Sequence, residues 1–160
     1  MEKEFTNIIS THQGIIFKVC RMYCNDREDS EDLFQEIVLQ LWRSYPAFNA
    51  QAKVSTWMYR IGLNTAITRL RKNNRKPLTQ PLSIEHQNLK DPVPQRMDIE
   101  YGEELQTAIN MLNKLDKALV MLYLDEKSYK EIAEIMGISE SNVGVKINRI
   151  KKKLQEIINP

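Results

Sequence analysis

The sequence predicts an all-α protein with two small helical domains joined by a flexible, proline-containing linker. Apolar residues recur at steps of three and four through most of the chain, which is the period of an α-helix. A proline-rich stretch, residues 77–97, interrupts this pattern, and so long a loop is unusual inside one compact domain. The 160 residues are 42% hydrophobic and 28% charged, a globular composition. We therefore expect domains at residues 1–76 and 98–160, with the linker at 77–97.

Composition also limits where the protein acts. The longest apolar run, residues 118–124, is far too short to cross a bilayer, and the N-terminal residues lack a signal-peptide pattern. These features predict a cytoplasmic protein without membrane insertion. Cys20 and Cys24 lie four residues apart on one expected helix, so we expect reduced thiols that are buried or half-buried. No metal-ligand spacing accompanies them, and we expect no metal and no cofactor.

The first domain begins with a helical apolar stripe over residues 5–23, and Asp26 is placed to cap the helix that follows. The core side of this second helix contains Leu33, Phe34, Ile37, Leu41 and Tyr45. Its outer side contains Asp32, Gln35, Glu36, Leu39 and Arg43. Leu39 is an apolar residue among polar ones, which is typical of a helix that binds a partner.

The third helix, expected within residues 55–72, has two distinct faces. Its apolar stripe is Tyr59, Leu63, Ala66, Ile67 and Leu70. Its opposite face carries Trp57, Arg60, Asn64, Thr68 and Arg71. An aromatic ring, an amide and cations suit unpaired DNA, because bases stack on aromatic rings and arginine follows the strand. The preceding loop offers Phe48, Asn49 and Gln51 to hold an unstacked base. The alternative is that Trp57 packs into the domain and the arginines are only solvated.

Charge is segregated along the chain although the net charge is only +2. Residues 26–36 carry six acids against one arginine, whereas residues 69–76 and 146–153 each carry five bases and no acid. This segregation suggests separate surfaces for separate partners, and the alternative for any one run is a solvated helix face.

The second domain contains a helix-turn-helix pattern after two expected helices, the second of which Asp116 is placed to cap. Ser128 and Glu131 form a capping box for a short helix that ends near Met136. Gly137 supplies the sharp turn, and Ser139 caps a longer helix.

The longer helix has an inner side and a reading face. Val143, Ile147, Ile150, Leu154 and Ile157 are expected to pack inward. The outer residues are Ser141, Asn142, Val145, Asn148, Arg149 and Lys152. Asparagine pairs with adenine edges, arginine with guanine edges, and a valine methyl with a thymine methyl, so this face suits the major groove. Lys146, Lys151 and Lys153 flank it, where they can reach phosphates.

These motifs together resemble a known family. The segments "DSEDLFQEIVLQLWRSYPAF" and "STWMYRIGLNTAITRLRK" resemble region 2 of sigma-70-type transcription initiation factors. The segment "LNKLDKALVMLYLDEKSYKEIAEIMGISESNVGVKINRIKKKL" resembles region 4. A short chain with only these two regions is similar to the extracytoplasmic-function (ECF) group. The resemblance covers nearly the whole chain.

The resemblance implies a role for each matching position. The surface of Asp32, Gln35, Glu36 and Leu39 would dock on the β′ coiled coil of core RNA polymerase. Trp57, Asn64 and the loop around Phe48 would separate the strands at the −10 element and capture a flipped base. The helix from Ser139 would read the −35 element, and region 4 would dock on the β flap. Many relatives are held inactive by an anti-sigma factor, which is a further expected partner.

Two departures from the family pattern stand out. Many relatives have an arginine where this chain has Gly144, and many have leucine-proline where this chain has Leu115-Asp116. The first difference removes a possible guanine contact from the recognition helix.

Two rival readings differ in class. A stand-alone helix-turn-helix regulator would explain residues 128–158 but not the outer face of the third helix, and it would bind its duplex without polymerase. An enzyme has no support in the motifs: the two histidines, His12 and His86, lie far apart in sequence, and no phosphate-binding glycine loop is present. We therefore expect no enzymatic activity.

Overall fold

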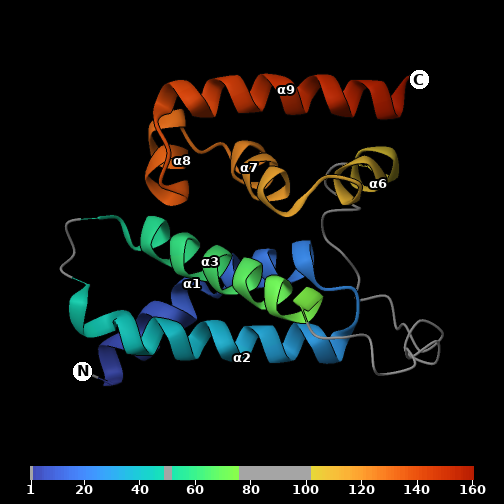
Figure 1. The fold of residues 1–160 in the computed structure, drawn as a ribbon. Coiled ribbons are helices and arrows are strands. Elements are labelled where there is room, and N and C mark those ends of the chain that lie inside the picture. The colour runs from blue at the N-terminus through green and yellow to red at the C-terminus, as the bar shows by residue number, and fades with distance from the viewer. Residues whose placement is uncertain (1, 49–51, 76–101) are drawn as a thin grey trace. The chain divides into compact units, whose positions relative to one another are not determined.

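The computed structural model describes residues 2–48, 52–75 and 102–160, and side chains within these ranges except those of residues 73–75. The chain divides into two compact units, with the boundary between Val93 and Pro94. The described part of each unit is built from helices, which confirms the all-α fold (Figure 1). The predicted linker, residues 77–97, lies outside the described residues.

The first unit contains α1 (Glu2–Tyr23), α2 (Arg27–Ser44), the short 3-10 helix η1 (Tyr45–Ala47) and α3 (Val54–Arg75). Asp26 begins α2 as predicted, because its side chain accepts a hydrogen bond from the backbone N–H of Asp29 at 2.7 Å. Each of the three α-helices packs against the other two (Figure 1). Their buried side chains form one core, including Ile16, Val19, Leu33, Ile37, Leu41, Met58, Tyr59, Leu63 and Ala66.

The second unit contains α6 (Glu103–Asn110), α7 (Lys114–Leu124), α8 (Tyr129–Met136) and α9 (Glu140–Ile158). The long helix α9 packs against α6, α7 and α8, which lie along one side of it (Figure 1). The core includes Ile109, Leu119, Leu122 and Ile132, together with Val143, Ile147 and Ile150 from α9.

The helix-turn-helix forms as predicted. Ser128 and Glu131 make both hydrogen bonds of the capping box at the start of α8. Gly137 adopts a left-handed conformation with φ 71° and ψ 34°, which allows the sharp turn between α8 and α9. The hydroxyl of Ser139 then accepts a hydrogen bond from the backbone N–H of Asn142 at 3.1 Å, which starts α9.

Two details of the second unit correct the sequence interpretation. The cap of α7 is Asn113 rather than Asp116, because α7 begins three residues earlier than expected and Asn113 accepts a hydrogen bond from the backbone N–H of Asp116 at 2.9 Å. Ile157 is 37% exposed rather than packed inward. It lies in the last turn of α9, where Ile157 and Ile158 line an open hollow together with residues of α6.

Candidate nucleic-acid and polymerase interfaces

The outer face of α9 is available to a partner. Ser141, Asn142, Val145, Asn148, Arg149 and Lys152 are exposed, and Lys146 is half-buried. Beneath them Val143, Ile147 and Ile150 are buried, so the inner packing fixes which side chains point outward. Val145 is 49% exposed, although an apolar side chain gains nothing from solvent. A helix with this polar face and one exposed valine has the chemistry that reads a major groove.

One flank of α9 is formed by aromatic side chains from neighbouring helices. The Lys151 ammonium lies 4.6 Å from the centre of the Tyr123 ring, and a hydrogen bond with Tyr123 raises the pKa of this lysine. Beside it, the Tyr129 ring approaches Gly144: a Cβ added to this glycine would lie 3.5 Å from Cε2 of Tyr129. Sequence reasoning missed both tyrosines, because their proximity to α9 depends on how the helices pack.

The other flank holds a lysine by an ion pair. Nζ of Lys153 lies 3.4 Å from Oδ2 of Asp116, at the first turn of α7. Lys153 keeps 57% of its side chain exposed. The predicted phosphate-binding lysines of α9 are thus partly engaged within the unit, whereas Lys152 on the reading face is exposed.

The outer face of α3 carries the polar residues predicted to meet unpaired DNA. Arg60, Asn64, Thr68 and Arg71 are exposed. On the inner side, Met58, Tyr59, Leu63 and Ala66 are buried. Gly62 lies against α1 and α2: a Cβ at this position would lie 3.6 Å from Val19 Cγ2 and 3.8 Å from Ile37 Cγ2, which are ordinary van der Waals contacts. The close inner packing therefore fixes the direction of the outer face.

Trp57, the expected stacking platform, is half-buried rather than fully exposed. Its ring stacks on Phe48 with centroids 4.5 Å apart and an angle of 23°, and the Tyr45 ring lies 6.2 Å away. Trp57 thus packs partly into its own unit and still reaches solvent, and its role as a stacking platform for DNA bases stays a prediction. Phe48, which the sequence placed only in the neighbouring loop, stacks on Trp57, whereas Asn49 and Gln51 lie outside the described residues.

The outer face of α2 presents the residues predicted to bind polymerase. Asp32, Gln35 and Leu39 are exposed, and Glu36 is half-buried. Leu39 has 44% of its surface exposed and Trp42, one turn later, 41%. Trp42 packs edge-to-face on Phe5 at 5.0 Å, which leaves part of its ring in solvent. Sequence reasoning missed Trp42, although its spacing of three from Leu39 was a readable signal.

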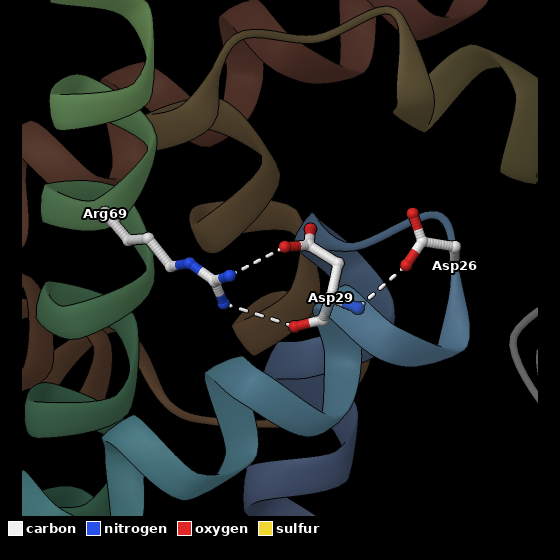
Figure 2. Close-up of polar contacts among 3 residues, drawn as sticks. All are labelled: Asp26, Asp29 and Arg69. Carbon is white, nitrogen blue, oxygen red and sulfur yellow. Dashed lines mark hydrogen bonds and ion pairs between the residues drawn. The ribbon is translucent and has the colours of Figure 1, made fainter. Parts of the chain in front are cut away.

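The basic run at the end of α3 divides between two environments. Arg69 is directed towards the start of α2, where its guanidinium contacts Asp29 at 2.7 Å (Figure 2). Arg71 and Lys72 are exposed. The run is therefore not a uniform cationic surface, and Arg69 serves a contact within the unit.

Cys20 and Cys24 are buried and not bonded to each other, as predicted. Burial raises the pKa of the Cys20 thiol to about 11 and raises the pKa of Cys24 as well, so both thiols are protonated at neutral pH. Among the described residues, histidine, cysteine and acidic side chains form no cluster suited to a metal ion. None of the described helices is long and apolar enough to cross a membrane.

Comparisons with known proteins agree with this arrangement. Residues 8–76 match the family described as Sigma-70 region 2, and residues 102–154 match Sigma-70, region 4. The chain is 28% identical to the ECF RNA polymerase sigma factor SigW of Bacillus subtilis, over 95% of this chain and 87% of that protein. It is 27% identical to the ECF RNA polymerase sigma-E factor of Haemophilus influenzae, over 99% of this chain and 89% of that protein.

Solved structures give the same fold. The sigma factor RpoE of Bartonella quintana, crystallised with the anti-sigma factor NepR, superposes with a TM-score of 0.65 at 18% identity and covers 98% of this chain and 95% of its own. CnrH, in complex with the cytosolic domain of CnrY, gives a TM-score of 0.69 at 17% identity and covers 99% of this chain and 90% of its own. Because both sigma-70 regions are matched in order and the relatives from Bacillus subtilis and Haemophilus influenzae are ECF sigma factors, this protein belongs to the ECF group of the sigma-70 family of RNA polymerase sigma factors.

Proposed function

We propose that this chain binds core RNA polymerase, directs it to specific promoters by recognising −10 and −35 elements, and assists strand separation. The observation that carries the proposal is the presence of both sigma-70 regions on one chain, over residues 8–76 and 102–154. A stand-alone helix-turn-helix regulator needs only the second of these. The chain itself catalyses no reaction in this proposal, and it acts in the cytoplasm, where polymerase and promoter DNA are found.

The proposed roles of the side chains follow from their exposure and chemistry. On α9, Asn142, Val145 and Arg149 read base edges of the duplex −35 element. On α3, Asn64 and Arg71 hold the separated strand at the −10 element while Trp57 supplies an aromatic face. Exposure of the polar members of both sets supports these roles.

The proposed polymerase surface lies on α2. Leu39 and Trp42 give it an exposed apolar centre, with carboxylates of Asp32 and Glu36 and the amide of Gln35 beside it. An apolar anchor surrounded by polar groups is the usual composition of a binding hot spot. The partner is the β′ coiled coil, and the second unit docks on the β flap.

An anti-sigma factor is a further proposed partner. RpoE, a protein of the same fold, was solved in complex with the anti-sigma factor NepR, and CnrH was solved in complex with the cytosolic domain of CnrY. An inhibitor of this chain would act by covering the α2 surface or the α9 reading face, because initiation needs both of them.

A gel-shift experiment separates this function from the stand-alone regulator. Labelled promoter DNA is mixed with the chain alone, with core polymerase alone, and with both. The proposal predicts a specific, competitor-resistant shift only when both are present. A specific shift produced by the chain alone at the same concentration would favour the stand-alone regulator.

A further inference from the structure

An ion pair joins the two functional helices of the first unit through one residue on each helix that is not itself part of a predicted contact surface. Arg69 on α3 and Asp29 on α2 are separated by forty residues in sequence. Nη2 of Arg69 donates to Oδ1 of Asp29 at 2.7 Å, and Nη1 donates to the backbone carbonyl of the same residue at 3.2 Å (Figure 2). One planar guanidinium therefore donates hydrogen bonds to both the side chain and the backbone of Asp29. Two such bonds fix the orientation of Arg69 relative to Asp29 as well as the distance between them.

Asp29 is itself held in place by the start of its helix. Its backbone N–H donates to Oδ1 of Asp26, the N-cap, at 2.7 Å (Figure 2). The cap, the carboxylate and the guanidinium thus form a continuous chain of contacts from the first turn of α2 to α3. Only 21% of the Arg69 side chain and 43% of the Asp29 side chain are exposed, so solvent screens this pair less than a surface pair.

Contacts between α2 and α3 occur along most of α3, and the Asp29–Arg69 pair lies near its end. Near the beginning of α3, Trp57 meets Tyr45 and Phe48, which follow the end of α2. In the middle, Gly62 lies against Ile37. Towards the end of α3, Arg69 reaches the first turn of α2. The two helices are therefore in contact at both ends of their interface. Rotation of α3 about its axis would break the hydrogen bonds between Arg69 and Asp29.

We propose that the Asp29–Arg69 pair is a positioning link that transmits the placement of α2 on polymerase to the strand-binding face of α3. Asp29 precedes Asp32 by one turn on α2, and Arg69 lies between Thr68 and Arg71 on α3. When polymerase holds α2, this link sets the rotation of α3 and thereby presents its outer face to the separating strands. The inference rests on the proposed function, because it concerns how one bound factor acts on promoter DNA.

The test compares promoter opening on two templates that differ only in whether the strands are already apart. Full-length variants Asp29→Asn, Arg69→Gln and the double variant are mixed at saturating concentration with core polymerase. One template is a duplex promoter identified by mapping RNA 5′ ends, and the other carries a mismatched bubble over its −10 element. Opening is followed by permanganate reactivity and the first short RNA products, and holoenzyme formation is measured in native gels.

If the pair has this role, each single variant should lower the rate of promoter opening on the duplex template about fivefold. On the bubble template, the rate of short RNA synthesis should change less than about twofold. The double variant should be no worse than either single variant, because both remove the same contact. Arg69→Lys keeps the charge without the planar fork and should fall between wild type and Arg69→Gln. The matched control is Arg27→Gln, which removes an exposed pair with Glu31 at 3.9 Å on the same helix turn and should behave as wild type.

An equal loss of activity on the duplex and bubble templates would contradict the proposed positioning role, because it would indicate only that the first unit is less stable. Additive losses in the double variant, or normal opening by both single variants, would overturn it as well. If Asp29→Asn or Arg69→Gln does not fold, Arg69→Lys carries the same comparison. Wild-type protein that fails to open the duplex with core polymerase would instead refute the proposed function, so the two failures are distinguishable.

Discussion

Replacing Trp57 by alanine tests the proposed strand-binding role, because this ring has partners within the protein and a proposed partner in DNA. Within the unit it stacks on Phe48 at 4.5 Å and lies 6.2 Å from Tyr45. Each aromatic pair contributes about 0.5–1.5 kcal/mol, so truncation should lower the free energy of unfolding by about 1–3 kcal/mol. If a base also stacks on Trp57, the same substitution should make the free energy of promoter opening less favourable by ~1–3 kcal/mol. That loss corresponds to about a 5- to 150-fold change in the opening equilibrium.

The assay separates these two losses. Thermal unfolding measures the first, and permanganate reactivity of −10 thymines at saturating holoenzyme measures the second, with closed-complex binding recorded at low temperature. Trp57→Phe keeps an aromatic face and should retain most opening. Phe5→Leu is the control, since Phe5 packs on Trp42 and Tyr45 in the same unit but lies on no proposed DNA surface. The stacking role is refuted if Trp57→Ala is destabilised yet opens the promoter as efficiently as Phe5→Leu.

Four other outcomes follow from the same structure. Asp32→Lys or Leu39→Arg should weaken core polymerase binding about tenfold in native-gel titration, and normal holoenzyme would remove this surface. Arg149→Ala should lose about 1–3 kcal/mol of discrimination at one −35 position, whereas equal losses across promoter variants would contradict base reading. Gly137→Ala, at φ 71°, should lower the Tm of the second unit by about 4–8 °C in calorimetry, and an unchanged Tm would exclude strain at the turn. The Cys20 thiol, with its pKa raised to about 11, should react slowly with a disulfide reagent at pH 7 and faster as pH rises; rapid reaction in the folded protein would contradict its burial.

Local signals predicted most of the fold. Asp26, Ser128 and Ser139 each cap a helix as the sequence indicated, and Gly137 takes the left-handed turn conformation. These features depend on residues within one helical turn of each other, which is why a sequence reveals them. The prediction that Asp116 caps α7 was wrong for a reason that is also local. Asparagine and aspartate are both common N-cap residues, and the structure places Asn113 in this position.

Contacts between distant residues could not be predicted from the same signals. The basic run around Arg69 reads as one cationic surface in sequence, and only the packing of α3 on α2 directs this arginine to Asp29. The stacking of Phe48 on Trp57 likewise depends on how α3 packs against α2. Helical period indicates which side chains share a face, but it does not indicate which neighbour occupies that face.

The measurement that tests the central proposal most directly is in vitro transcription with purified core polymerase and genomic DNA, followed by sequencing of RNA 5′ ends. Addition of this chain should produce new starts at defined positions that share a −10 and a −35 element at constant spacing. Starts that are unchanged from core polymerase alone, or scattered without shared upstream sequence, would contradict the proposal that this chain directs polymerase to promoters.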